Sequence, residues 1–304
     1  MSLDKDAAEY LSREQGIDPA FVEKDWHAVR VLGALSRHSY GSVTTIFTGG
    51  TSLSKGHDLL KRFSEDLDFR ARFEGNFSAN QLKKLKSAFR FSVIEALREI
   101  EGIAFDEEGI EKDGLGFKIQ LTYPKVFEAP EGIRAELQVE FSYTQPRLEP
   151  EQRSIASMIT SYKGEADETS FLCLSPVEIA ADKFSSLVWR VLKRNRDDEK
   201  DDPAMIRHLH DLCALKGRIQ AEQDLFIATA LESFAIDQER VNRRVEMELG
   251  EASKHAADKL KSDDLYEEEY QQFVDAMSYA RDDEVISFEK ALNEFDALLK
   301  MFSK

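Results

Sequence analysis

Hydrophobic side chains in the first half of the chain follow two kinds of spacing. Residues 19–38 and 82–100 carry apolar side chains at every third or fourth position, which predicts two amphipathic helices. Four shorter stretches are apolar throughout or alternate between apolar and polar residues, as β-strands do. They are residues 43–47, 66–73, 117–121 and 137–141. The first half therefore predicts a small mixed β-sheet with helices packed against it.

The second half of the chain shows helical spacing. We expect helices over residues 176–191, 203–217, 222–261 and 264–302, with a charge-dense loop at 193–202. The stretch 222–261 is either one helix or a helix with a break. Residues 144–170 between the halves are polar and contain Pro146, Pro150 and Gly164, with one short strand expected at 155–162. We therefore expect an α+β domain over residues 1–165 and an all-helical C-terminal domain over residues 166–304.

Charge and composition narrow the classes of partner. The 304-residue chain has a formal net charge of −17, so its whole surface is unsuited to gripping long nucleic acid. A local basic pocket for one nucleotide or an RNA end remains compatible with this charge. We find no apolar run of the roughly 18 residues that a transmembrane helix requires and no signal peptide. With only Cys173 and Cys213 in the sequence, we expect a cytoplasmic protein.

Residues 43–73 hold the clearest candidate chemistry. Gly49, Gly50, Thr51 and Ser52 follow the first strand and precede a helix expected over residues 53–61. Glycines let backbone N–H groups approach a ligand, and the N-terminus of a helix suits phosphate. The next strand has a two-residue period, so Asp66 and Asp68 share one face. Two carboxylates beside a phosphate-binding turn can hold Mg²⁺ against a triphosphate.

A third carboxylate is expected on a neighbouring strand. Glu140 lies on the polar face of the strand 137–141, and pairing with the strand of Asp66 and Asp68 would bring the three together. Three carboxylates can hold the pair of metal ions that nucleotidyl transfer uses. We therefore predict Asp66, Asp68 and Glu140 as catalytic metal ligands for Mg²⁺ or Mn²⁺, with an NTP as substrate.

These motifs resemble a known family. Gly-Gly-Thr-Ser-Leu-Ser-Lys, followed by Arg-Phe-Ser-Glu-Asp-Leu-Asp-Phe, is similar to the signature of the AbiEii/AbiGii-type nucleotidyltransferase toxins. That family belongs to the DNA-polymerase-beta-like nucleotidyltransferase superfamily. The resemblance implies that the turn at Gly49 to Ser52 contacts phosphate through backbone N–H and hydroxyl groups. Lys55 either reaches a phosphate or pairs with a carboxylate, and Arg62 is either a phosphate contact or a surface side chain.

The resemblance continues into the second half. Ala-Asp-Lys-Phe at 181–184 and Arg-His-Leu-His-Asp-Leu at 207–212 are similar to two further family motifs. They imply that Lys183 and Asp211 face the nucleotide, the Asp as a base or a positioning group. From the residues alone, a Lys and an Asp on neighbouring helices would form a salt bridge. The family's acidic strand also implies Glu140 as the third metal ligand.

The resemblance implies a nucleotidyltransferase whose helical domain completes the active-site cleft. The expected reaction moves an NMP from an NTP to a hydroxyl of a tRNA-like RNA or a protein, and the enzyme would be a toxin restrained by a cognate antitoxin. One alternative is nucleotidylation of a small molecule, as in antibiotic-modifying members of the superfamily. Another is a non-catalytic nucleotide-binding protein. The acidic C-terminal helices and the loop at 193–202 leave the acceptor open.

Overall fold

The chain forms two compact units. The computed structural model describes residues 2–128, 134 and 136–302. One unit, here called the sheet unit, comprises Met1–Asp58 and Phe63–Leu174. The other, called the helical unit, comprises Leu59–Arg62 and Ser175–Lys304. A four-residue segment of the N-terminal half thus belongs to the helical unit.

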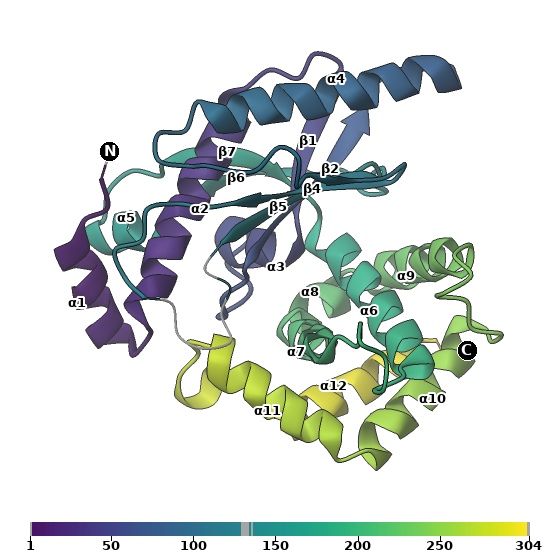
Figure 1. The fold of residues 1–304 in the computed structure, drawn as a ribbon. Helices are drawn as coiled ribbons and strands as arrows, with labels where there is room; N and C mark the ends of the chain where they lie inside the picture. Colours follow the sequence, from purple (N-terminus) through teal and green to yellow (C-terminus); the bar gives the residue numbers. More distant parts are fainter. Residues whose placement is uncertain (1, 129–133, 135, 303–304) are drawn as a thin grey trace. The chain divides into compact units, whose positions relative to one another are not determined.

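A mixed sheet forms the centre of the sheet unit, with seven strands among the described residues in the order β3-β4-β5-β2-β1-β7-β6 (Figure 1). The strands are β1 (Val43–Thr48), β2 (Asp66–Phe73), β3 (Glu111–Lys112), β4 (Gly116–Leu121), β5 (Leu137–Ser142), β6 (Glu151–Ile155) and β7 (Thr169–Cys173). Strand β2 runs antiparallel to β1 and parallel to β5, and β1 runs parallel to β7. The mixed sheet predicted from hydrophobic spacing is confirmed.

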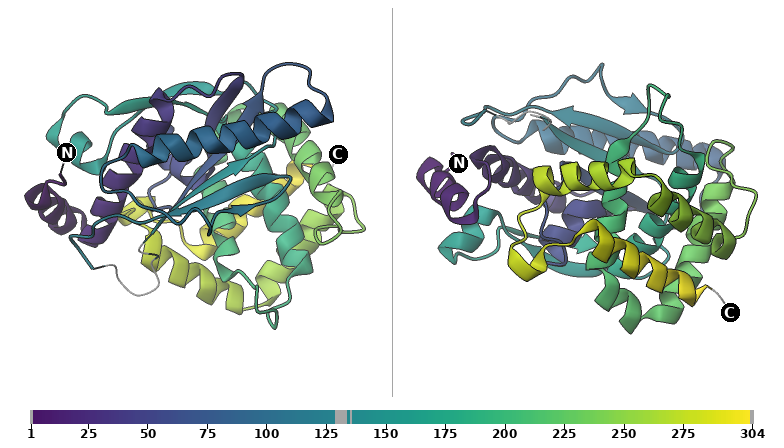
Figure 2. Two further views of the ribbon diagram at one scale, coloured as in Figure 1. Left: turned by 45° about the horizontal axis from the view of Figure 1, so that its top comes forward. Right: turned by 90° about the horizontal axis from the view of Figure 1, so that it is seen from below.

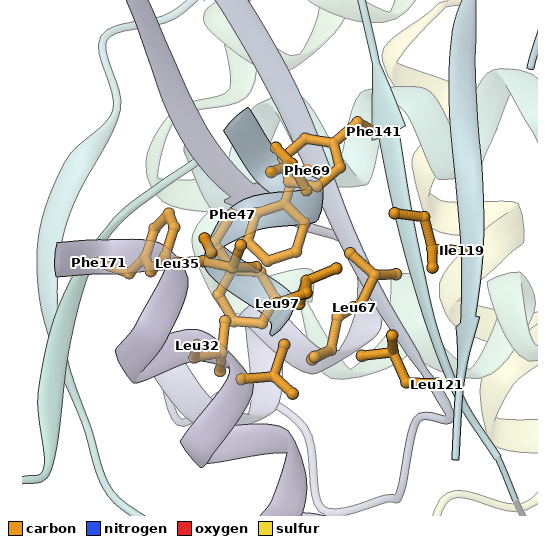
Figure 3. Close-up of a cluster of buried hydrophobic side chains, with 14 of the residues drawn as sticks. Leu32, Leu35, Phe47, Leu67, Phe69, Leu97, Ile119, Leu121, Phe141 and Phe171 are labelled. Atoms are coloured by element: carbon orange, nitrogen blue, oxygen red, sulfur yellow. The ribbon is translucent and has the colours of Figure 1, made fainter. Parts of the chain in front are cut away.

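Two long helices cover one face of this sheet (Figures 1 and 2). The helical segments of the sheet unit are α1 (Lys5–Gln15), α2 (Pro19–Arg37), α3 (Gly49–Thr51), η1 (Ser52–Gly56), α4 (Ala79–Arg98) and α5 (Met158–Lys163). Leu32 of α2 and Leu97 of α4 pack with Leu67 and Phe69 of β2 in the buried core (Figure 3). Because successive side chains of a strand point to opposite faces, Asp66 and Asp68 lie on the other face.

Two local predictions are wrong. The strand expected at 155–162 is instead helix α5, because Ser157 accepts a hydrogen bond from the Thr160 amide and Gly164 ends the helix at φ 65°. The helix expected to run to Lys61 ends at Gly56, since Asp58 takes a left-handed conformation at φ 51°. The chain then leaves the sheet unit at Leu59.

The sheet is also larger than the predicted one. Strands β6 and β7 lie within the polar segment that we expected to join two domains, and β7 pairs with β1. The sheet unit therefore extends to Leu174 rather than residue 165. The pattern of β6 is weak, because it is a polar edge strand with a single fully buried residue, Ile155.

The helical unit confirms the all-helical prediction for the second half. Its described segments are α6 (Pro176–Lys193), η2 (Pro203–Ile206), α7 (Arg207–Ala214), α8 (Lys216–Ala221), α9 (Gln223–Gln238), α10 (Leu249–Ser262), α11 (Leu265–Met277), η3 (Asp282–Glu284) and α12 (Phe288–Met301). Helix α6 packs against α7, α9 and α10. Phe184 of α6 contacts the rings of Phe226, Phe295 and Phe302. Within the described ranges, no helix is both long and apolar enough to cross a membrane.

The charged loop at 193–202 has a structural role within the helical unit. Arg194 is 5% exposed and pairs with Asp201 and with Glu269 of α11. Arg194 and Arg196 also lie over the ring of Tyr266, at 5.2 and 4.7 Å from its centroid. These charge-assisted and cation–π contacts attach the loop to α11.

Candidate functional site

The Gly-Gly turn lies against one of the predicted metal ligands. Thr48, the last residue of β1, pairs with Asp68 of β2, and Gly49 follows with φ 77°. A Cβ atom at position 49 would lie 2.2 Å from Oδ2 of Asp68. Position 49 therefore requires glycine both for its backbone conformation and for the space that Asp68 occupies.

The three predicted carboxylates lie on two adjacent strands. In the parallel pairing of β2 with β5, Asp68 lies opposite Glu140 and Asp66 lies opposite Gln138. Adjacent strands are about 4.8 Å apart, so Asp68 and Glu140 are direct neighbours, with Asp66 two residues away on the same face. The strand pairing that the sequence predicted is therefore present.

The environment of Glu140 favours a bound cation. Burial raises the pKa of Glu140, the negative charges of Asp66, Glu111 and Asp113 raise it further, and Lys118 opposes them. The Nζ atom of Lys118 lies 3.9 Å from Oε2 of Glu140. Carboxylates gathered in this way repel one another, and a cation relieves that repulsion.

Arg134 is a counter-ion for Asp66 in this structure. Its Nη2 atom donates to Oδ1 of Asp66 at 2.8 Å, and its Nη1 atom donates to Gln138 at 3.0 Å. Its backbone is also held, because its N–H donates to Glu65 and its carbonyl accepts from Lys24. The sequence did not single out Arg134, which lies outside every motif.

The carboxylate oxygens of Asp66, Asp68 and Glu140 are of the chemical type that a hard divalent cation prefers. Mg²⁺ prefers oxygen ligands, and three carboxylates in neighbouring register supply them. Among the described residues, no three His, Cys, Asp or Glu side chains already converge on one ion position. The positive charges of Arg134 and Lys118 lie beside Asp66 and Glu140, respectively, and partly balance the negative charge of these carboxylates.

The side chains of the Gly-Gly turn mostly brace the turn itself. The hydroxyl of Thr51 donates to the carbonyl of Asp66 at 2.6 Å, and the hydroxyl of Ser52 donates to that of Phe47 at 3.2 Å. Both residues are buried. The two hydroxyls are therefore engaged within the protein, whereas the first N–H groups of a helical turn have no carbonyl partner within it.

Lys55 pairs with a carboxylate, one of the two roles that the sequence left open. Its ammonium group forms an ion pair with Asp25 of α2, and the same carboxylate accepts from the Met158 amide at 2.7 Å. Lys55 also donates to the carbonyl of Ala156. Lys55 therefore connects η1 to α2 and to the start of α5.

Lys183 and Asp211 form, within the helical unit, the salt bridge that the residues alone predicted, and a third residue joins them. Asp211 is fully buried, and Lys183 Nζ lies 2.7 Å from its Oδ2 atom. Arg62 donates to both carboxylate oxygens, each at 2.7 Å. Arg62 is 2% exposed, so it is neither a surface side chain nor a solvent-facing phosphate contact.

This arrangement determines the ionisation of Asp211. Burial raises the pKa of Asp211, but Arg62 and Lys183 outweigh burial and hold it well below its usual value. A carboxylate that binds a proton so weakly is a poor general base at neutral pH. The geometry favours the positioning role over the base role.

The fold and the site together define a class of protein. A mixed sheet that presents carboxylates from two adjacent strands beside a Gly-Gly turn is the arrangement expected of a nucleotidyltransferase. The chain belongs to the family described as nucleotidyl transferase AbiEii toxin of type IV toxin–antitoxin systems, which matches residues 30–300. The family predicted from the motifs is therefore confirmed.

Other comparisons are more distant. A solved structure of MenT4, a nucleotidyltransferase toxin from Mycobacterium tuberculosis H37Rv, is 15% identical in sequence with a TM-score of 0.43. The match covers 84% of this chain and 98% of that one. No curated protein sequence matches the chain.

Proposed function

We propose that this chain transfers a nucleoside monophosphate from an NTP to a hydroxyl group of an RNA or protein acceptor. The observation that best supports the proposal is the register of β2 and β5, with Asp68 opposite Glu140 and Asp66 on the same face. Membership in a nucleotidyltransferase family supports the class of reaction.

In this proposal Asp66, Asp68 and Glu140 hold Mg²⁺ or Mn²⁺. The ion supplies positive charge that neutralises the triphosphate and orients it for displacement. Backbone N–H groups of Gly49, Gly50 and Thr51 bind phosphate oxygens, while the hydroxyls of Thr51 and Ser52 and the bond from the Ser52 N–H to the Gly49 carbonyl keep the turn in shape. Lys55 supports the same turn through Asp25.

The residues of the helical unit have supporting roles. Lys183 is the proposed phosphate contact, and Asp211 holds its ammonium group in place from a distance of 2.7 Å. Arg62 orients Asp211 through two hydrogen bonds. The acceptor hydroxyl would lose its proton to a group other than Asp211, because the low pKa of that carboxyl opposes protonation.

The family also suggests the biological setting. Its description places these chains in type IV toxin–antitoxin systems. We therefore propose that the chain acts as a cytoplasmic toxin whose activity a cognate antitoxin restrains.

The decisive experiment measures transfer of label from each α-³²P NTP to total cellular RNA and protein in the presence of Mg²⁺. Wild type is compared with the double variant Asp66→Ala plus Asp68→Ala, and with Glu95→Ala on the exposed surface of α4 as the control. Label that appears with wild type and Glu95→Ala but not with the double variant supports the proposal and identifies donor and acceptor. Transfer that survives in the double variant would refute the assigned metal ligands.

Absence of transfer to either macromolecule has a separate meaning. With nucleotide binding still measurable, it would favour a small-molecule acceptor or a non-catalytic nucleotide-binding protein. The net charge of −17 would then point to a cationic small molecule as the first acceptor to test.

A further inference from the structure

Helix α9 is apolar on its exposed side as well as on its buried side. The buried side packs against α6, with Phe226 and Phe234 in the core. On the other side, Leu225, Leu231 and Ile236 are 39%, 48% and 43% exposed. Surface helices normally carry polar side chains on their outer face, and helices that are apolar all round are normally buried. The outer side of α9 therefore has the composition of a covered surface.

The apolar side chains on the outer side of α9 form a continuous strip. With 3.6 residues per turn, the exposed Ala228 and Ala235 lie between Leu225 and Leu231 around the helix axis. Small alanine side chains between larger ones leave room for the side chains of another helix. From Leu225 to Ile236 the strip is about 16 Å long, which matches three turns of a partner helix.

A groove continues the strip beyond the end of α9. It has a volume of about 720 Å³ and lies between the C-terminal end of α9, the loop that follows and the start of α10 (Figure 1). Leu231 and Met247 line it, and Met247 is 37% exposed. Contacts within the helical unit hold the loop against α9, because the Val245 amide donates to Oε1 of Gln238 and Nε of Arg244 donates to its carbonyl. The groove is therefore preformed.

The charges beside the strip and the groove are mostly negative. Helix α9 contains no Lys or Arg, and Asp224 and Glu232 are exposed on the same side as the strip. Three glutamates and one arginine line the groove. Complementary charge across an interface favours the right partner, and like charge excludes the wrong one. An apolar surface with acidic flanks therefore suits a partner that is apolar and cationic.

We propose that the strip and the groove, together called the α9 surface, bind a cationic amphipathic helix of another protein. The apolar face of that helix would cover Leu225, Leu231 and Ile236, and Lys or Arg beside it would face Asp224 and Glu232. A helix suits the site better than an extended peptide, because the described part of the helical unit contains no β-strand whose edge a peptide could join. Pairing with α9 of a second copy would bring only carboxylates together, so we assign the surface to a different protein.

Binding of a designed peptide to the full chain tests the proposal. The probe is a fluorescein-labelled peptide of leucine and lysine, about five helical turns long, with leucine at every third or fourth position. A second probe has glutamate in place of lysine, and fluorescence anisotropy measures the affinity of each. The variants are Leu231→Gln and Glu232→Lys. Their matched controls on α11 are Leu265→Gln, at a position 46% exposed, and Glu268→Lys, also at an exposed position.

We expect wild type to bind the leucine–lysine peptide and not the leucine–glutamate peptide. Leu231→Gln should weaken binding about tenfold, because the contact of one leucine is lost. Glu232→Lys should weaken binding about fivefold at low salt and less at high salt, because salt screens exposed charges. Both control variants should bind as wild type does. Hydrogen exchange should slow on binding in α9 and the loop that follows it, and thermal unfolding checks that each variant is folded.

Three results would overturn the proposal: no binding of the leucine–lysine peptide by wild type, equal effects of Leu231→Gln and Leu265→Gln, or slowed hydrogen exchange away from α9. Sedimentation of the chain alone tests the other occupant. A dimer that Leu231→Gln dissociates would assign the α9 surface to a second copy and refute a separate partner. None of these measurements depends on nucleotide transfer, so the α9 surface and the proposed function stand or fall separately.

Discussion

Replacing Arg62 with methionine would leave Asp211 buried with Lys183 as its remaining close cationic partner. The two hydrogen bonds of 2.7 Å from Arg62 would be lost, and neither residue is more than 2% exposed. Removing one partner of a buried ion pair costs 3–5 kcal/mol in general. Because Lys183 still compensates part of the charge, we expect the lower end, about 3 kcal/mol.

The control is an exposed ion pair in the same unit. Lys261 contacts both oxygens of Asp296 at 2.7 Å, but the two side chains are 44% and 34% exposed. Solvent screens such a pair, so Lys261→Met should cost about 0–1 kcal/mol. The pair of variants therefore separates the effect of burial from the effect of contact geometry.

Tryptophan fluorescence makes the assay specific to the helical unit. The chain has two tryptophans, Trp26 in the sheet unit and Trp189 in the helical unit. In a Trp26→Phe background, urea unfolding followed by fluorescence reports on Trp189 alone. With a urea dependence of about 2 kcal/mol per molar, Arg62→Met should lower the midpoint by about 1.5 M. A shift no larger than that of Lys261→Met would refute the stabilising role of the buried pair.

The same variants carry a pH dependence. The folded-state pKa of Asp211 lies below its unfolded value, because Arg62 and Lys183 outweigh burial. Its contribution to stability is therefore complete above the unfolded pKa and is lost as the pH falls through the lower folded pKa. In Arg62→Met the folded pKa moves upward towards the unfolded value, so acidification should remove less stability than in wild type, and the loss should end at a higher pH. Parallel acid-unfolding curves for the two proteins would contradict this.

Three further predictions concern the sheet unit. Gly49→Ala should cost about 1–2 kcal/mol for its left-handed backbone and should also reduce transfer at least tenfold, because its Cβ would lie 2.2 Å from Asp68. Gly41→Ala is the control, because Gly41 has a similar φ of 64° but a Cβ atom there would meet nothing within 4 Å. Equal losses of activity in the two variants would contradict a role for the contact with Asp68. Burial raises the pKa of Cys173 to about 11, so its thiol should resist iodoacetamide at pH 8 until urea unfolds the protein, and mass spectrometry would detect premature labelling. Burial raises the pKa of Glu140, so this carboxylate takes up a proton at a higher pH than an ordinary glutamate does. As the pH falls, Mg²⁺ affinity measured by calorimetry should therefore begin to decline at a pH above the usual pKa of glutamate, and Glu140→Gln should abolish this pH-dependent decline.

Local sequence determined the fold class and the faces of the site strands. Alternation along β2 places Leu67 and Phe69 in the core and therefore places Asp66 and Asp68 on the opposite face, whatever strands lie beside them. Glycine at position 49 was equally readable, because a residue without a Cβ marks a turn or a close approach of backbone. Short-range periodicity carries these features because they depend on a few neighbouring residues.

Tertiary structure alone decided which distant groups meet. The pairing of Arg62 with Asp211 joins residues 149 positions apart, and Arg134 reaches Asp66 across 68 positions. The polar strand β6 belongs to the sheet because β7 pairs with it, which its own weak pattern did not reveal. The same physical reason holds in each case: an ion pair or a strand ladder gains its free energy from a partner remote in the chain, and local residue patterns do not contain that partner.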